Sequence, residues 1–527
     1  MYRFDRWCGR LVMLAAFVFL LGPLLPLPAQ APPNSADPLH RAVAALYDGI
    51  QEATLPNGLR VVLKPIPDAT TVTVMTVYRV GSADEQLDQT GLAHYLEHLM
   101  FKGTRQLMPG DIDRMTRRAG GRNNAYTTYD FTNYHFDFAS GRWDTALRIE
   151  ADRMRNLQID DQHEFQQEKG AVIAELDGNE DVPFDLENKT ILPLLFGEKS
   201  PYGHPVIGEK THVRNVTAEQ IKAFYDRWYH PNNATIVMVG AFDPVQALEL
   251  IRELFGPIPA KDLPPRQAFE APQREEPVLV EIPSRFETER LVLGFNTCRR
   301  GDDDDYVLDV IEALLSGGKT GRLYRKLVLE KEVAAEVVCA NQTGLHPGWF
   351  SIEMEITRGT DRQQAEKALL EELERLAREP VTEAELHRVE RNVVAGMIFS
   401  HEDPHDLADS IAEAVATVGL DYLRGYLPRI RAVTPADVQR VARKYFQPQR
   451  RVVVASVLGK DESARSNSFK TRGGRGSALP RPTVATASRS RPADSRQLRN
   501  PPGPLASPPP SLDLAATRWV TLDNGLT

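Results

Sequence analysis

Two histidines and a glutamate stand at a spacing that suits metal chemistry. The segment His94-Tyr-Leu-Glu97-His98 is predicted to be helical, and a separation of four residues puts both imidazoles on one face, one turn apart. Glu97 projects from the same side, where it could take a proton from a metal-bound water whose pKa zinc lowers to about 7. H-x-x-E-H reverses the order of the metal-binding pattern H-E-x-x-H, although five residues alone are equally compatible with a solvated helix face.

A third metal ligand must come from elsewhere in the chain, and Glu168 and Glu175 are candidates. They are seven residues apart, since 175 − 168 = 7, so on a helix they share one face at a distance of two turns. The apolar run between them would bury this helix, and a buried glutamate needs a partner such as zinc. The alternative is an exposed row of glutamates that also includes Glu164.

The segments that must carry these residues mix strands and helices. Two β-rich runs, 58–64 and 71–78, precede the motif helix expected over 90–101, and a β-hairpin is expected over 124–138. Further helices are predicted at 111–118, 143–157, 165–178 and 218–228, with a strand at 233–240. Because strands and helices do not alternate strictly, the pattern favours an α+β layered fold.

An internal repeat indicates two homologous domains. Residues 216–231 and 433–448 each begin with Val-Thr, continue as an N-capped helix and end in a proline before an apolar strand. They are 217 residues apart, since 433 − 216 = 217. We therefore expect a first domain with the H-x-x-E-H segment over 50–260 and a second domain over 275–458, joined by the Pro- and charge-rich stretch 257–277.

The N-terminal region predicts export. Arginines precede an apolar run and a small-residue cleavage site, which is the layout of a secretory signal peptide over residues 1–31, followed by a lead-in over 32–49. An uncleaved anchor is the alternative, but prolines make the run short for a membrane span. We expect an exported protein, periplasmic or extracellular, with no integral membrane span in the mature chain.

The C-terminal region has a different composition. Residues 461–516 are rich in Ser, Arg, Pro and Gly, which predicts a disordered linker. Residues 519–527 then echo 52–60, as though a further module began over 517–527. We therefore expect the chain to be part of a longer two-module protein, or a truncated product.

Charge and cysteine content restrict the partners. The net charge of −9 argues against nucleic acid as the main partner. There is no CxxC, so a cysteine-based zinc site is not expected. Cys298 and Cys339 could pair in an oxidising compartment or remain two buried thiols.

Taken together, these residues resemble the pitrilysin/insulinase family of zinc metallopeptidases, which includes the mitochondrial processing peptidases and similar bacterial proteases. In that family H-x-x-E-H is followed by E-x6-E at a distance close to the one found here, 77 residues from His98 to Glu175, since 175 − 98 = 77. The resemblance implies that His94, His98 and Glu175 bind one zinc ion. It also implies that Glu97 is the general base and that Glu168 is a second catalytic carboxylate supporting the site.

The resemblance implies a pitrilysin-like fold of two related domains, each a mainly antiparallel sheet covered by helices. Two such modules close around an unfolded peptide, which adds as a strand to a sheet edge beside the metal. In this sequence that edge would be 122–128, with Asn124, Ala125 and Tyr126 contacting the substrate.

One part of the family pattern is missing. The second domain has no H-x-x-E-H, and its matching helix is expected near 309–315. Active members also draw an arginine and a tyrosine from a second module, but Arg322 and Tyr324 fit the ordinary loop of the second domain better. A further module or a dimer partner is expected to supply that pair.

The expected function is therefore zinc-dependent endopeptidase. The alternatives are a non-catalytic scaffold or partner subunit of a two-component peptidase, and a metal-binding folding factor. The complete set of site residues argues against the first alternative, and Glu97 argues against the second, because a structural metal site needs no base.

Two other histidine-containing segments are expected to be structural. His401-Glu-Asp-Pro-His405 matches H-E-x-x-H by letters, but Pro404 is tolerated only in a first helical turn, which would leave His401 outside the helix. His204 is expected to be structural or to line the rim of the site.

Overall fold

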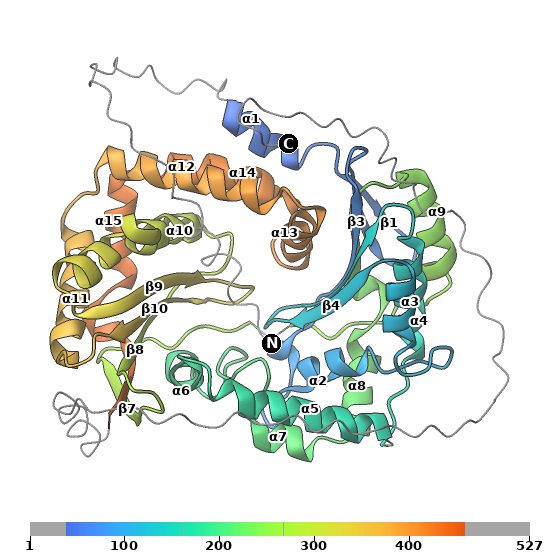
Figure 1. Ribbon diagram of the computed structural model, residues 1–527, viewed down its shortest axis with the longest axis horizontal. Helices are drawn as coiled ribbons and strands as arrows, with labels where there is room; N and C mark the ends of the chain where they lie inside the picture. The colour runs from blue at the N-terminus through green and yellow to red at the C-terminus, as the bar shows by residue number, and fades with distance from the viewer. Residues whose placement is uncertain (1–37, 162, 267, 459–527) are drawn as a thin grey trace, which may run out of the picture.

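The computed structural model describes residues 38–161, 163–266 and 268–458. The predicted signal peptide, the predicted linker 461–516 and the segment 517–527 lie outside the described residues. The described chain forms two sheets, one from each half of the sequence, each covered by helices (Figure 1). This confirms the expected α+β fold of two layered, mainly antiparallel domains.

The first sheet has six strands in the order β1-β2-β6-β3-β5-β4. Its strands are β1 (Gln51–Thr54), β2 (Arg60–Pro65), β3 (Thr71–Tyr78), β4 (Arg122–Thr127), β5 (Thr132–Ala139) and β6 (Ala234–Gly240). β2 and β6 are parallel and the other neighbours are antiparallel. β-Branched residues dominate the central strands β3 and β6, which suits strands buried on both faces.

The second sheet has five strands in the order β7-β11-β8-β10-β9. Its strands are β7 (Val278–Pro283), β8 (Arg290–Asn296), β9 (Ala334–Gln342), β10 (Trp349–Ile356) and β11 (Val452–Val457). Only β7 and β11 pair in parallel. When β1 is left out, the order and directions of the two sheets match strand for strand, so the repeat in the sequence is also a repeat in the structure.

The helices of the first half include the two that carry the predicted metal ligands, α2 and α5. They are α1 (Pro38–Leu46), α2 (Leu92–Leu99), α3 (Asp111–Arg118), α4 (Asp144–Asn156), α5 (His163–Asn179), α6 (Asp185–Phe196), α7 (Lys210–Asn215), α8 (Ala218–Trp228) and α9 (Pro244–Phe255). The lead-in predicted over 32–49 therefore contains a helix, α1, which packs against the second half through Val43, together with Tyr47 just beyond its end.

The second half contributes six α-helices to the described residues. They are α10 (Asp303–Ser316), α11 (Arg362–Arg378), α12 (Glu383–Ser400), α13 (Pro404–Ala416), α14 (Leu420–Ala432) and α15 (Pro435–Tyr445). A π-helical turn over Tyr324–Glu330 was not predicted. Helix α10 is also longer than the segment expected near 309–315.

The two halves exchange helices across their interface. Helix α13 of the second half packs on β3 and β6 of the first sheet, and α6 of the first half packs on β8 and β11 of the second (Figure 1). Buried apolar side chains such as Leu407 and Ile411 of α13, and Leu195 of α6, make these contacts. Each sheet therefore depends on the other half for the cover of one face.

Two further expectations are settled by the described residues. Cys298 and Cys339 are separate buried thiols, so the alternative of a disulfide between them is wrong. Within the described ranges, every helix is too short or too polar to cross a bilayer.

Candidate metal centre

Helix α2 is fixed at its N-terminus, which sets the direction of the motif it carries. The Glu85 carboxylate accepts hydrogen bonds from the backbone N–H groups of Gly91 and Ala93, both at 2.7 Å, and so caps the helix. Gly91 has φ 93°, and a Cβ there would lie 2.6 Å from the carbonyl oxygen of Ile207. The close contact with that loop therefore requires glycine.

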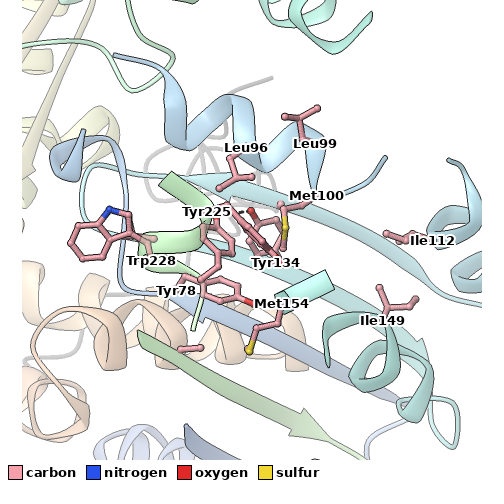
Figure 2. Packing of buried hydrophobic residues seen from close by; sticks show 14 of the residues in the cluster. Tyr78, Leu96, Leu99, Met100, Ile112, Tyr134, Ile149, Met154, Tyr225 and Trp228 are labelled. Atoms are coloured by element: carbon pink, nitrogen blue, oxygen red, sulfur yellow. Dashed lines mark hydrogen bonds between the residues drawn. The ribbon is translucent and has the colours of Figure 1, made fainter. Parts of the chain in front are cut away.

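The apolar face of α2 packs onto the first sheet and leaves the polar face free for chemistry. Figure 2 shows Leu96 and Met100 above Tyr134 in the buried cluster. Under the end of the helix, fully buried Arg153 donates to the Met100 carbonyl oxygen at 3.5 Å and to Glu150 at 3.1 Å. A cation at this end also suits the helix dipole.

His94, His98 and Glu175 bring their ligand atoms together. These three residues form a group in which the candidate ligand atoms all lie within 4.8 Å of one another. Glu175 Oε2 is 3.4 Å from His98 Nε2, and Glu175 Oε1 is 3.9 Å from His94 Nε2. Ligands about 2.1 Å from a tetrahedral zinc ion are about 3.4 Å apart, so the separations of these three donors fit zinc.

The two glutamates are held by α5. This helix buries Phe165, Val172 and Leu176, so its flank faces α2. Glu168 is 5% exposed, and its Oε2 lies 3.4 Å from His98 Nδ1, on the side of the ring opposite Glu175. The alternative of an exposed glutamate row is therefore wrong for Glu168.

Burial and mutual contacts lower the pKa values of His94 and Glu175 and raise that of His98. Burial lowers the pKa of His94 to about 3, so this imidazole is neutral and able to donate its lone pair. Burial also disfavours the charged form of His98, but hydrogen bonds to Glu168 and Glu175 raise its pKa to about 9. Burial raises the pKa of Glu175, but the hydrogen bond with His98 outweighs it and brings that pKa to about 2.

Glu97 lies beside the ligands and contacts the neighbouring sheet edge. Burial raises its pKa to about 7, against the opposing effect of a hydrogen bond from Thr127. The Thr127 hydroxyl donates to Glu97 Oε2 at 2.6 Å and so orients the carboxylate. A carboxyl group with a pKa near neutrality is suited to general base work.

The strand β4 forms the edge of the first sheet next to this site. Thr128 N–H donates to the Phe131 carbonyl oxygen in the turn that joins β4 to β5. Because backbone groups alternate in direction along an antiparallel strand, those of Tyr126 and Asn124 point to β5 and those of Thr127 and Ala125 point to the open edge. Among the described residues no strand pairs beyond β4, so Arg122–Thr127 forms an edge of the sheet.

The three predicted substrate-contacting residues differ in their surroundings. Ala125 is buried on the α2 side, and Asn124 is exposed. The Tyr126 hydroxyl donates to Asp409 Oδ1 at 2.7 Å, which ties β4 to helix α13 of the second half. Its side chain is therefore directed at α13 rather than toward the open edge.

The other sequence candidates lie outside this group. Arg322 donates to both oxygens of Glu385, at 2.8 and 2.9 Å, as expected for a structural residue. Tyr324 lies in the π-helical turn. His401 follows the end of α12 and contacts the Met397 carbonyl oxygen, which agrees with the rejection of H-E-x-x-H at this place.

His204 and His405 are both buried, and neither belongs to the group of candidate metal ligands. His204 Nδ1 lies 3.2 Å from the Pro205 carbonyl oxygen, and burial lowers its pKa. His405 is on α13, and its Nδ1 lies 2.8 Å from Asp137 of β5. Its contact therefore joins the two halves.

Sequence reasoning missed two residues that contact the site, Thr127 and Lys102. Thr127 is two residues beyond Ala125, so alternation along β4 could have placed it on the α2 side. Lys102 is four residues after His98, the spacing of one helical turn, and its Nζ lies 2.8 Å from Glu168 Oε1.

Comparison with known proteins matches two parts of the chain to one family. A model described as Insulinase (Peptidase family M16) matches residues 60–194, and one described as Peptidase M16 inactive domain matches residues 215–393. The first of these ranges contains His94, Glu97, His98, Glu168 and Glu175.

The chain is also similar to individual proteins over most of its described length. It is 29% identical over 413 residues to zinc protease PqqE of Helicobacter pylori, covering 75% of this chain and 90% of that one. It is 24% identical over 404 residues to an Arabidopsis thaliana protein named for the mitochondrial-processing peptidase subunit beta, covering 75% of each. The crystal structure of a protease from Helicobacter pylori matches with a TM-score of 0.73 at 27% identity, covering 77% of this chain and 99% of that one.

Proposed function

Because the chain belongs to the insulinase family of peptidases, family M16, we propose that it is a zinc-dependent endopeptidase that hydrolyses unfolded peptides or polypeptide segments. Relatives named as zinc proteases support the peptidase class. The observation that carries the proposal is the meeting of the ligand atoms of His94, His98 and Glu175 within 4.8 Å, beside the buried carboxyl group of Glu97.

In the proposed reaction His94, His98 and Glu175 hold one zinc ion, and Glu168 supports His98. When bound, the metal supplies a Lewis acid for the scissile carbonyl and lowers the pKa of the attacking water. Glu97 accepts a proton from that water and then donates it to the nitrogen of the leaving amine.

The substrate is proposed to bind as an added strand on β4. The outward backbone groups of Ala125 and Thr127 would pair with the peptide backbone, and Thr127 also contacts Glu97. This arrangement would place a peptide bond next to the base only if the substrate is extended. Backbone pairing reads conformation more than side chains, so unfolded segments are the expected substrate class.

A partner and an exported location are further parts of the proposal. Arg322, which fits the ordinary loop of the second domain better than the family's arginine–tyrosine pair, forms an ion pair with Glu385. We therefore propose that a second peptidase module or a dimer partner completes the substrate site. The signal peptide predicted from residues 1–31 supports export to the periplasm or the extracellular space.

Metal removal and restoration test the proposed function. The purified chain is treated with a chelator, and cleavage of an unfolded polypeptide is followed by mass spectrometry before and after one equivalent of zinc is returned. The proposal predicts internal cleavage that is lost with the metal and recovered with zinc. Zinc binding without cleavage, even with a partner module present, would favour the non-catalytic scaffold instead.

A further inference from the structure

Lys102 lies at the outer end of a short series of polar contacts that leads to the candidate metal ligands. Its Nζ is 2.8 Å from Glu168 Oε1, and the other oxygen of the same carboxylate is 3.4 Å from His98 Nδ1. The opposite ring nitrogen of His98 faces Glu175 at 3.4 Å. We propose that Lys102 is a positioning residue, which fixes Glu168 and through it the orientation of the His98 ring toward zinc.

A positioning residue is needed because the ring of His98 can rotate. This histidine is in the last turn of α2 and its side chain is 24% exposed, so packing restrains its ring less than that of buried His94. The outer torsion of a histidine side chain has broad minima, so the ring orientation is not fixed by the torsion itself. For one ring nitrogen to bind a metal, the other must carry the proton. A carboxylate that accepts a hydrogen bond from Nδ1 fixes both the tautomer and the orientation of the ring.

Glu168 can orient His98 only if its own carboxylate is held. The Lys102 ammonium group occupies Oε1, which leaves Oε2 for the imidazole. The neighbouring Lys169 does not share this task, because its Nζ donates to the Val216 carbonyl oxygen at 2.7 Å. Lys102 also places a positive charge beside the carboxylate of Glu168, in the turn that follows α2.

The backbone holds Lys102 in a position from which it can reach Glu168. Its N–H donates to the Leu99 carbonyl oxygen at 2.9 Å, which continues the helical path for one more turn. Its side chain is 32% exposed, so it can be replaced without opening a cavity in the core.

Zinc affinity of the metal-free protein tests this inference, which rests on the proposed metal site. Lys102→Met keeps an unbranched side chain of similar length and removes the ammonium group. Lys102→Arg keeps a positively charged hydrogen-bond donor. Lys210→Met is the matched control. Lys210 begins α7 and forms an exposed ion pair with Asp177 of α5, the helix that also carries Glu168. Affinities are measured by competition with a chromophoric chelator, and urea unfolding of each metal-free variant is measured in parallel.

The expected result is a loss of about tenfold in zinc affinity for Lys102→Met, the lower end of the effect of removing an outer partner of a metal ligand. Lys102→Arg restores most of the affinity, and Lys210→Met leaves it unchanged although both ion-pair variants unfold at similar urea concentrations. Equal zinc affinity in Lys102→Met and the unchanged chain overturns the inference, as does equal weakening in Lys210→Met. Absence of zinc binding by the unchanged chain overturns the metal site itself.

Discussion

Glu97 combines burial with a single well-placed hydrogen-bond donor. The residue is 8% exposed, and burial raises the pKa of its carboxyl group to about 7, while the hydroxyl of Thr127 favours the charged form. The same threonine lies on β4, the strand proposed to bind the peptide. Thr127 would therefore link the position of the proposed base to the proposed position of the substrate.

Replacing Thr127 with valine should lower kcat by about tenfold, because a hydrogen bond to a charged acceptor contributes about 1.5–3 kcal/mol. Zinc content should not change. Since the lost hydrogen bond favours the carboxylate, the pKa of Glu97 should rise, and the acidic limb of the pH profile of kcat/KM should move to higher pH. Steady-state kinetics over a range of pH measure both effects.

The second half offers a matched control for this variant. Thr343 follows β9 and donates to Asp305 of α10 at 2.8 Å, the same kind of contact that Thr127 makes with Glu97. Thr343→Val should leave kcat and the pH profile unchanged. A profile for Thr127→Val that coincides with that of Thr343→Val would contradict a role for Thr127 in holding the base.

The residues of the site differ in how far the sequence could predict them. The spacing of His94 and His98 follows from helical periodicity, as does that of Glu168 and Glu175, so both pairs could be predicted from the residues alone. The assignment of Glu175 as the third ligand came from the family resemblance. The contact between Lys102 and Glu168 depends on the packing of α2 on α5. No local pattern in the sequence specifies that contact.

At the scale of elements, α13 supports the proposed substrate strand from the opposite face of the sheet. Asp409 Oδ1 accepts hydrogen bonds from Tyr126 at 2.7 Å and from Asn133 at 3.3 Å, so one carboxylate holds both β4 and β5. The half of the molecule without H-x-x-E-H thus contributes to the position of β4.

Asp409→Ala should raise KM by about three- to tenfold with little change in kcat or zinc content, since a lost charged hydrogen bond costs about 1.5–3 kcal/mol while β5 still holds β4. Asp421→Ala on α14 is the control, because that side chain is 99% exposed. Peptide hydrolysis at several substrate concentrations separates KM from kcat. A fall in kcat with unchanged KM would argue against this role of α13.

Helix α12 begins with an ion pair that should make stability depend on pH. Glu385 is the third residue of α12 and accepts from Arg322 and from Thr382. Burial raises its pKa, but the hydrogen bonds from Arg322 and Thr382 outweigh this and lower it from 4.5 to about 2. The stability that this carboxylate contributes is therefore present above pH 4.5 and is lost as the pH falls toward about 2.

Glu385→Gln should be less stable than the unchanged chain above pH 4.5, and the difference should shrink as the pH is lowered. Urea unfolding at a series of pH values measures it. A difference that stays constant between pH 4.5 and about 2 would show that the ion pair does not cause the pKa shift.

Element boundaries were predicted best where local signals are strong. The helix at 218–228 agrees at both ends, because Thr217 forms a capping box with Gln220. Helix α1 was not predicted within the lead-in, because it packs on the second half instead of forming part of a local pattern. The exchange of α6 and α13 was likewise beyond prediction, since it depends on contacts between distant parts of the chain.

At the scale of the whole molecule, the exchanged helices should make the two halves unfold together. Ile411 of α13 is fully buried against the first sheet. Ile411→Ala should destabilise the protein by about 2–5 kcal/mol. Fluorescence of variants that retain only Trp228, in the first half, or only Trp349, in the second, should report the same shifted midpoint, whereas a shift in one half alone would contradict the coupling.

The internal repeat also shows how the halves have diverged. Helix α10 follows β8 as α2 follows β3, but it has no histidine. Its carboxylates are instead satisfied by neighbouring side chains, such as Asp309 by Asn341 at 2.8 Å and by Tyr426 at 2.9 Å. The second half therefore retains the architecture of the first and uses the corresponding position for packing.

Cleavage of a quenched fluorogenic peptide by the purified chain, with zinc content measured on the same samples, tests the central claim most directly. The unchanged chain and Glu97→Gln are compared, because the substitution removes the base and leaves the ligands His94, His98 and Glu175 in place. The proposed function predicts about one zinc ion per chain in both, and a loss of about 10²–10⁴-fold in kcat in the variant. Equal turnover by Glu97→Gln, or a well-folded chain that binds no zinc, would contradict it.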